Sequence, residues 1–201
     1  GLKDHIISHY KRLYGAHIER DWIVLVPSVI SGVVNALKLK GGTFMYSVPM
    51  YDHIRTLHKE ARLPFIEVPL KKEGTHYSMD ISALEAAVTA EVSCLILCSP
   101  HNPVGRVFTA EELLALDDFC KRHGLTVISD EIHCELDLES RHIPYFALSA
   151  GAAVNSVTLS SAGKICNIPG LPFGFAIIPD DELRQSFAAG YEGLLPSGNV
   201  M

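Results

Sequence analysis

The sequence has no apolar run long enough to cross a membrane, no excess of positive charge and no paired-cysteine pattern. Its longest apolar runs, WIVLVP and CLILC, have the length of β-strands, and its first residues carry no secretion signal. The formal net charge is −6, and lysine and arginine are scattered along the chain. We therefore expect a cytoplasmic globular protein that binds neither a membrane nor nucleic acid.

The spacings typical of metal and nucleotide sites are also lacking. The five cysteines include no CxxC pair, and their odd number favours free thiols over a disulfide framework. The ten histidines include no HExxH, and neither GxGxxG after a strand nor GxxxxGK[ST] occurs. These absences argue against a metal site, a nicotinamide dinucleotide site and a nucleoside triphosphate site.

What is present is an alternation of short apolar runs with segments of helical periodicity. The seven runs are Trp22–Val26, Thr43–Ser47, Phe65–Val68, Cys94–Cys98, Leu125–Ser129, Ser156–Ser160 and Phe173–Ile178. Helices are predicted near residues 1–15, 28–40, 50–62, 80–90, 109–123 and 180–194. Apolar runs without polar alternation indicate strands buried on both faces, as in parallel sheets.

We therefore predict an α/β fold, a three-layer sandwich with a mostly parallel seven-stranded sheet. The last run is the exception, because only about a dozen residues, rich in glycine and proline, separate Ser160 from Phe173. A parallel connection needs a longer crossover, usually a helix. Residues 173–178 are therefore expected to form one antiparallel strand, and no repeat or linker divides the chain.

Four of the runs are followed by a polar residue, at the sheet edge where open α/β folds bind ligands. Ser28 can cap a helix whose free N–H groups attract a phosphate. Asn102 lies in a loop fixed by two prolines, and Asp130 ends a buried strand, where a carboxylate needs a partner. Lys164 stands on a turn loosened by glycine. Alone, each also fits a plain reading: an N-cap, a turn, a helix cap or a solvated lysine.

Together these residues supply an amine, an acid, an amide and an anion cradle, the set that pyridoxal 5'-phosphate requires. The amine binds the aldehyde, the acid keeps the pyridine nitrogen protonated, the amide donates to the ring oxygen, and the helix start holds the phosphate. The combination predicts pyridoxal phosphate as the cofactor, with Lys164 as its covalent attachment point.

The same residues lie in segments that resemble the fold-type I pyridoxal-phosphate enzymes, in the class I/II aminotransferase-like branch. The segments are VPMYDHI, LILCSPHNPVGRVFTAEEL, VISDEIHCEL, SSAGKICNIPGL and GFAIIP. Within that branch the chain is most similar to carbon–sulfur lyases of the cystathionine β-lyase type. The resemblance covers essentially all 201 residues in order.

The resemblance implies a role for each matched residue. Lys164 would form the aldimine with the cofactor and move the α-proton, and Asp130 would pair with the pyridinium nitrogen. Asn102 would donate to the ring oxygen, and Tyr51 would stack on the ring. His133 stands where aminotransferases usually carry tyrosine, and histidine there is characteristic of the lyases.

The phosphate, by the same resemblance, would be held at the helix start and near the lysine. The residues expected to hold it are Ser28, the backbone of Val29 and Ile30, and Ser161. Two positions depart from the family: Gly163 replaces a serine before the lysine, and Ser28 replaces a common glycine. Ser160 or Ser161 would have to compensate for the first change. Asn167 is expected to brace the lysine loop.

We expect residues 1–201 to be the large cofactor-binding domain of a longer protein, because the first helix already carries an apolar stripe. The resemblance places the arginine that binds the substrate carboxylate in a C-terminal small domain, and adds an N-terminal segment that completes the site of a homodimer partner. Neither lies in these residues, so this chain alone is expected to turn over an amino-acid substrate poorly.

The activity that follows is α,β-elimination from L-cystathionine or a related cysteine S-conjugate, giving a thiol, pyruvate and ammonia. Two alternatives remain at this point. One is a class I/II aminotransferase, which requires a 2-oxo-acid acceptor. The other is a non-catalytic protein that keeps the fold and binds a partner, for which Gly163 is one argument.

Overall fold

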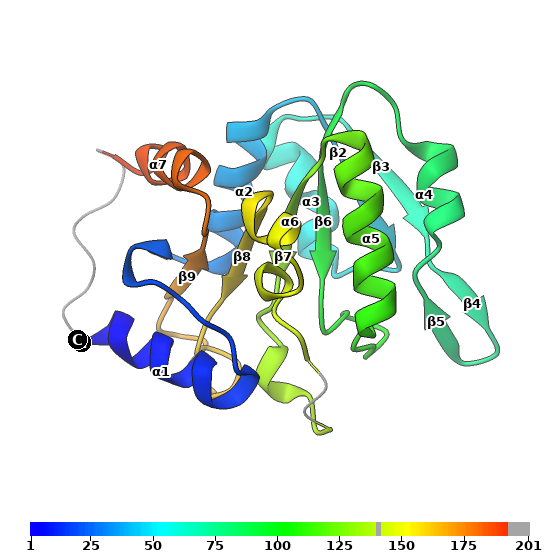
Figure 1. Ribbon diagram of the computed structural model, residues 1–201. Coiled ribbons are helices and arrows are strands. Elements are labelled where there is room, and N and C mark those ends of the chain that lie inside the picture. The colour runs from blue at the N-terminus through cyan, green and yellow to red at the C-terminus, as the bar shows by residue number, and fades with distance from the viewer. Residues whose placement is uncertain (140–141, 193–201) are drawn as a thin grey trace.

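The computed structural model describes residues 1–139 and 142–192, and these build a sheet covered by helices on both faces (Figure 1). The seven-stranded sheet has the order β1-β9-β8-β7-β6-β2-β3. Its strands are β1 (Ile23–Val26), β2 (Thr43–Val48), β3 (Phe65–Pro69), β6 (Val92–Cys98), β7 (Thr126–Asp130), β8 (Ser156–Ser160) and β9 (Gly174–Ile177). The predicted fold class is therefore confirmed.

Strand β9 is the one antiparallel strand of this sheet. It pairs antiparallel with β1 on one side and with β8 on the other, whereas the remaining pairs are parallel. The thirteen-residue connection from β8 contains no helix of its own, in agreement with the expected geometry of a short return. The prediction of an antiparallel strand at residues 173–178 is confirmed.

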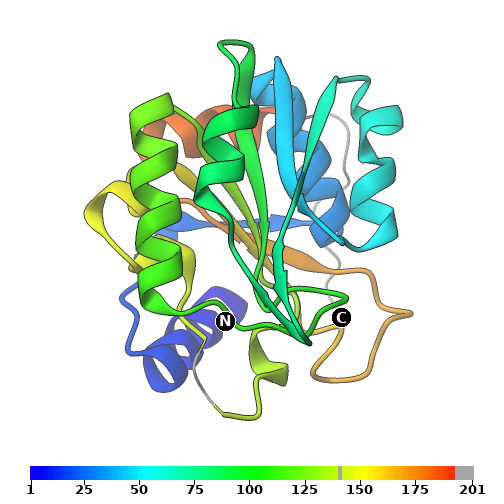
Figure 2. The same cartoon turned by 90° about the vertical axis from the view of Figure 1, so that its right-hand side faces the viewer.

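Two helical layers enclose the sheet, as Figure 2 shows with α5 and α3 on opposite sides. One layer contains α2 (Val29–Lys40), α3 (Asp52–Ala61) and α7 (Asp181–Ala189). The other contains α1 (Leu2–Tyr14), α4 (Ile81–Ala87), α5 (Ala110–His123) and α6 (Ala150–Val154). Residues 193–194 of the last predicted helix lie outside the described residues.

The helix boundaries follow the capping signals in the sequence. Thr109 and Glu112 form a reciprocal capping box at the start of α5, which ends at Gly124 in the left-handed conformation. Gly15 ends α1 in the same way, with φ of 65°. None of the helices in the described ranges is long and apolar enough to span a bilayer.

Several short elements were missed by the periodicity. These are a hairpin of β4 (Lys71–Glu73) and β5 (His76–Ser78), the helix α6, and the 3₁₀ turns η1 (Arg20–Trp22), η2 (Cys134–Leu136) and η3 (Tyr145–Ala147). The hairpin is polar and largely exposed, so its residues show no apolar alternation. The others contain only three to five residues.

Helix α2 crosses the sheet closely because glycine faces the strand beneath it. A Cβ on Gly32 would lie 2.4 Å from Cδ2 of Leu159 in β8. The side chains of α2 join those of α3 and the strands in one apolar cluster that includes Val33, Leu37 and Ile128. This packing fixes the start of α2 at the carboxyl edge of the sheet.

Candidate cofactor-binding site

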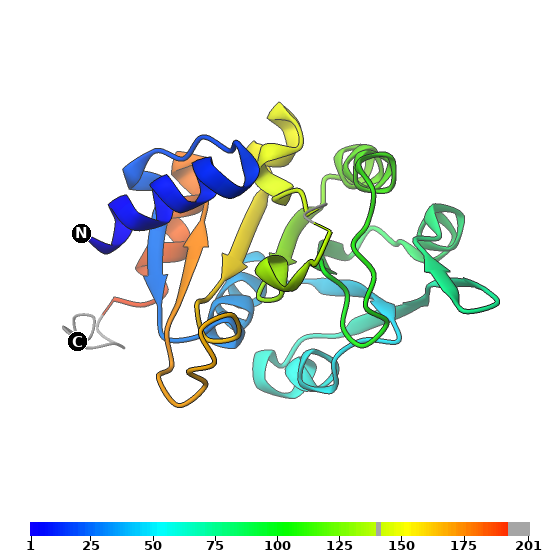
Figure 3. The same ribbon diagram turned by 90° about the horizontal axis from the view of Figure 1, so that it is seen from below.

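The carboxyl ends of the parallel strands lie along one edge of the sheet, and Figure 3 looks onto that edge. All residues singled out by the sequence follow or end these strands. They are Ser28, Val29 and Ile30 after β1, Tyr51 after β2, Asn102 after β6, Asp130 and His133 at the end of β7, and Ser161 and Lys164 after β8.

The start of α2 is arranged to receive an anion. Ser28 is the N-cap, and its Oγ accepts a hydrogen bond from the N–H of Ser31 at 3.1 Å. The hydroxyl of Ser31 in turn donates to the carbonyl oxygen of Ser28 at 2.8 Å. The first N–H groups of a helix have no partner within it, so those of Val29 and Ile30 remain to bind a ligand.

Gly174, at the beginning of β9, lies directly against this helix start. A Cβ at Gly174 would stand 3.1 Å from the carbonyl carbon of Ser28 and 3.1 Å from the nitrogen of Val29. A side chain there would therefore press on the peptide that offers its N–H to the anion. The sequence analysis did not identify Gly174, although it opens the quoted segment GFAIIP.

Asp130 is a buried carboxylate at the end of β7. The pKa of Asp130 is raised to about 6, chiefly by burial and in smaller part by the neighbouring charge of Glu131. The backbone N–H of Ile132 donates to Oδ1 at 3.1 Å, and this bond and the positive charge of Lys164 act in the opposite direction. A cation in contact with Asp130, such as a pyridinium N–H, would favour the ionised form.

His133 and Asn102 line a cavity of about 460 Å³ between residues 100–107 and 133–139. Partial burial lowers the pKa of His133, and the positive charge of Lys164 lowers it further. The imidazole is therefore neutral at pH 7. A neutral ring can donate from one nitrogen and accept at the other, next to the amide of Asn102.

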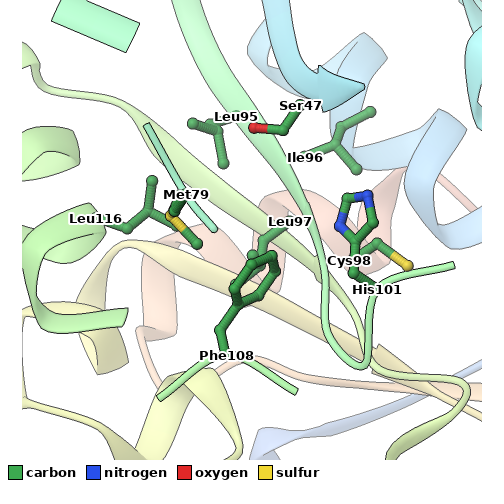
Figure 4. Close-up of a pocket in the computed structure, with 9 residues that line it drawn as sticks. All are labelled: Ser47, Met79, Leu95, Ile96, Leu97, Cys98, His101, Phe108 and Leu116. Atoms are coloured by element: carbon green, nitrogen blue, oxygen red, sulfur yellow. The ribbon is translucent and has the colours of Figure 1, made fainter. Parts of the chain in front are cut away.

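The loop that carries Asn102 is held by His101, which the sequence analysis did not single out. The His101 side chain is buried, and its Nε2 lies 2.8 Å from the carbonyl oxygen of Pro49. Its backbone N–H donates to the carbonyl oxygen of Arg106 at 2.7 Å. Figure 4 shows His101 above Phe108, beside a cavity of about 10 Å³ that has room for no more than a water molecule.

The Lys164 loop connects β8 to β9 and is wound into successive turns. The N–H of Ile168 donates to the carbonyl oxygen of Gly163 at 3.0 Å, and that of Asn167 to Lys164 at 3.2 Å. Asn167 has φ of 52°, a left-handed conformation that asparagine tolerates. Its backbone thus supports the turn, while the side chain of Lys164 is exposed to solvent.

The two serines before Lys164 have hydrogen-bond partners within the domain. The hydroxyl of Ser161 donates to the carbonyl oxygen of Phe173 at 2.6 Å and accepts from the N–H of Gly163 at 3.0 Å. That of Ser160 lies 3.3 Å from the carbonyl oxygen of Glu131. The hydroxyl of Ser161 would have to break its hydrogen bond to Phe173 in order to donate to a phosphate. The hydroxyl of Ser160 is directed to the carbonyl oxygen of Glu131 instead.

Tyr51, the residue expected to stack on the cofactor ring, lies at the surface of the domain. It is the N-cap of α3, and 43% of its surface is exposed. Its ring lies 6.2 Å from that of His53, centroid to centroid. Stacking of Tyr51 on a cofactor ring therefore stays a prediction from the resemblance.

These residues fit the group that the sequence predicts. The buried Asp130 has a raised pKa that a cation would offset, and Lys164 is within electrostatic reach of it. The helix start presents N–H groups next to Gly174, where no Cβ intrudes. An anion cradle, a carboxylate and an amine on one sheet edge match the phosphate, ring nitrogen and aldehyde of pyridoxal phosphate.

Comparison with known proteins agrees with this geometry. The chain is 32% identical over 195 residues to "Cystathionine beta-lyase PatB" of Bacillus subtilis. The aligned region covers 94% of this chain and 50% of the relative. It is also 32% identical to the "Probable N-succinyldiaminopimelate aminotransferase DapC" of Mycobacterium tuberculosis, with 94% and 48% covered. The chain thus spans about half the length of the curated relatives it matches.

Among solved structures, cystalysin from Treponema denticola superposes with a TM-score of 0.90 at 27% identity, covering 94% of this chain and 50% of that one. That structure is described as containing a pyridoxal 5'-phosphate cofactor, which agrees with the cofactor that the sequence predicts. The sheet and the site edge together define the fold of pyridoxal-phosphate-dependent transferases. The chain belongs to the aminotransferase class I and II family, whose model matches residues 2–194.

Proposed function

We propose that this chain is the cofactor-binding domain of a pyridoxal-phosphate-dependent carbon–sulfur lyase. The observation that carries the cofactor assignment is the grouping of the α2 start, Asp130 and Lys164 at one sheet edge. The choice of a lyase rests on His133 and on the similarity to a protein described as a cystathionine β-lyase. A substrate of the L-cystathionine or cysteine S-conjugate class follows from the same likeness.

In this proposal the two ends of the cofactor are held by different elements. The N–H groups of Val29 and Ile30 bind the phosphate at the positive end of the α2 dipole. Asp130 keeps the pyridine nitrogen protonated, because an ionised carboxylate in a buried position gains most from a cation in direct contact. Asn102 donates its amide N–H to the hydroxyl oxygen attached to the pyridine ring.

The bound cofactor supplies an electron sink that stabilises negative charge at the substrate α-carbon. Lys164 would hold the cofactor through its amine and, once the amine of the substrate had displaced it, would take the α-proton as the general base. Loss of this proton and of the thiolate from the β-carbon, followed by addition of water, yields thiol, pyruvate and ammonia. His133, with its lowered pKa, is a neutral hydrogen-bond partner beside the ring.

An aminotransferase is the second candidate, favoured by the 32% identity to a protein described as a probable N-succinyldiaminopimelate aminotransferase. The two reactions share the cofactor and Lys164, so the cofactor site does not separate them. They differ in their products, because amino transfer consumes a 2-oxo acid and leaves the carbon–sulfur bond intact.

The test is an assay with L-cystathionine and added pyridoxal phosphate in the absence of any 2-oxo acid, run long enough to detect the slow turnover expected of this chain alone. The lyase proposal expects equal amounts of pyruvate, ammonia and free thiol. Activity that appears only with a 2-oxo-acid acceptor would contradict it and favour the aminotransferase. The homodimer implied by the resemblance and the cytoplasmic location expected from the sequence are part of the proposal, and gel filtration with light scattering measures the first.

A further inference from the structure

Residues 131–139 and 142–145, called here the His133 loop, follow β7, and one side chain at the start of the loop contacts its far end. That side chain belongs to Glu131. Its Oε1 accepts hydrogen bonds from the hydroxyl of Ser129 at 2.9 Å and from the N–H of Tyr145 at 2.8 Å. Its Oε2 lies 3.0 Å from Nε2 of His142. One carboxylate thus joins β7 to the far end of the loop.

The backbone of Glu131 is fixed as firmly as its side chain. Its N–H donates to the carbonyl oxygen of Leu159 in β8 at 2.8 Å. Its own carbonyl oxygen accepts from the N–H of Cys134 at 2.9 Å and from the hydroxyl of Ser160 at 3.3 Å. Every polar atom of Glu131 therefore has a partner, and the residue is completely buried.

The His133 loop carries two parts of the site. His133 is its third residue, and residues 136–139 form one wall of the cavity of about 460 Å³. Asp130 immediately precedes the loop. Movement of the loop would therefore change both the imidazole position and the shape of the cavity beside Asn102.

The position of Glu131 is not explained by direct electrostatics at the site. Its negative charge raises the pKa of Asp130, which disfavours the ionised carboxylate that the cofactor requires. A fully buried carboxylate is itself unfavourable unless it is hydrogen-bonded and paired. We therefore attribute the buried position of the Glu131 carboxylate to the hydrogen bonds by which it holds Tyr145 and His142.

We propose that Glu131 is a positioning residue whose carboxylate closes the His133 loop and so holds His133 and the cavity wall beside Asp130. This inference rests on the proposed function and assigns a role to a residue that does not touch the cofactor. The conservative variant separates geometry from charge, since the amide oxygen of Glu131→Gln can still accept from Ser129 and Tyr145.

The experiment measures amide hydrogen exchange of residues 132–139 in the cofactor-free chain, together with the affinity for pyridoxal phosphate. Glu131→Ala is expected to speed exchange there about tenfold and to weaken cofactor binding about tenfold, because the loop loses its closing contacts. Glu131→Gln is expected to stay within about threefold of the wild type on both measurements. His142→Gln, which alters the Oε2 contact and the ring contact with Tyr14 but leaves the other Glu131 bonds in place, should change both by less than Glu131→Ala.

The matched control is Asp117→Ala, which removes another buried carboxylate. Asp117 accepts hydrogen bonds from the hydroxyls of Ser149 at 2.6 Å and Tyr145 at 3.3 Å and pairs with the amine of Lys121 at 2.7 Å, so the variant leaves the N–H of Tyr145 that binds Glu131 in place. Its loss should speed exchange in α5 and α6 and leave residues 132–139 and the cofactor affinity within about twofold.

Three results would overturn the inference: unchanged exchange at residues 132–139 in Glu131→Ala, equal effects of the alanine and glutamine variants, or the same change in Asp117→Ala. If Glu131→Ala does not fold, His142→Gln takes its place. Faster exchange at residues 132–139 in His142→Gln than in Glu131→Gln and Asp117→Ala supports the inference, and equal exchange in all three variants overturns it. A wild-type chain that binds no pyridoxal phosphate would refute the proposed function. The hydrogen-exchange rates of residues 132–139 would still show whether Glu131 holds the His133 loop in place.

Discussion

The backbone N–H of Ile132 donates a hydrogen bond to Oδ1 of Asp130 across 3.1 Å, and burial outweighs this bond. Burial raises the pKa of Asp130 from 3.8 to about 6. Between these values the folded chain binds more protons than the unfolded chain, so the free energy of unfolding falls as the pH rises through this window. At pH 7 the ionised Asp130 lowers the stability of the cofactor-free domain by up to about 3 kcal/mol.

Asp130→Asn is therefore expected to stabilise the cofactor-free domain at pH 7 by about 1–3 kcal/mol, with little effect near pH 4. The asparagine oxygen can still accept from Ile132, but no charge is left to pair with a pyridinium. Affinity for pyridoxal phosphate should fall at least about tenfold. Denaturant unfolding at the two pH values and a cofactor titration measure these effects. A variant that is less stable than the wild type at pH 7 would contradict the prediction.

Gly174→Ala should damage the phosphate site, because the new Cβ would stand 3.1 Å from the Ser28–Val29 peptide. We expect a loss of about 1–3 kcal/mol in stability from the crowding and a drop of about tenfold in cofactor affinity. The control is Gly170→Ala, since a Cβ there meets no atom within 4 Å. Titrations with pyridoxal phosphate and with inorganic phosphate measure the affinity of the site. Equal affinities of Gly174→Ala and Gly170→Ala would exclude the start of α2 as the phosphate site.

Gly163→Ser introduces the hydroxyl that the resemblance leads us to expect before the lysine. Its Cβ would lie 3.2 Å from Oγ of Ser161, a tight contact that requires a small shift of that hydroxyl. A hydrogen bond to a charged phosphate contributes about 1.5–3 kcal/mol, so the serine variant should bind the cofactor about tenfold more tightly than Gly163→Ala. Equal affinities of the two variants would place this position outside the phosphate site.

His133→Tyr tests the choice between elimination and amino transfer. The tyrosine hydroxyl reaches the same cavity as the imidazole but titrates far from pH 7. We expect less pyruvate from L-cystathionine and more transfer to an added 2-oxo acid, with the product ratio shifted by about tenfold. His133→Phe, which lacks any polar atom, is the control and should lose both activities. A product ratio that is the same for His133→Tyr and the wild type would contradict the assignment.

The strands could be predicted from the sequence because each central strand is buried on both faces and reads as an apolar run. The hairpin at residues 71–78 could not, because most of its side chains are exposed and need no apolar pattern. Ser28, Asn102, Asp130 and Lys164 could be placed on one sheet edge since parallel strands share a direction.

The supporting residues were not predictable by the same argument. His101, Glu131 and Gly174 act through partners far away in the sequence, such as Pro49, Tyr145 and the Ser28–Val29 peptide. The engagement of Ser161 with Phe173 likewise depends on the path of the returning strand β9. Local signals did exist, because His101 lies between Pro100 and Asn102, and Glu131 directly follows Asp130.

The side chain of Lys164 is exposed, so its attachment to the cofactor can be measured directly. The chain is mixed with pyridoxal phosphate, reduced with borohydride and analysed by peptide mass spectrometry, alongside Lys164→Ala and the control Lys121→Ala. We expect visible absorbance of the bound cofactor before reduction and a single modified peptide centred on Lys164 after it, both lost in Lys164→Ala and kept in Lys121→Ala. Absorbance that persists in Lys164→Ala, or modification spread over other lysines, would contradict this expectation.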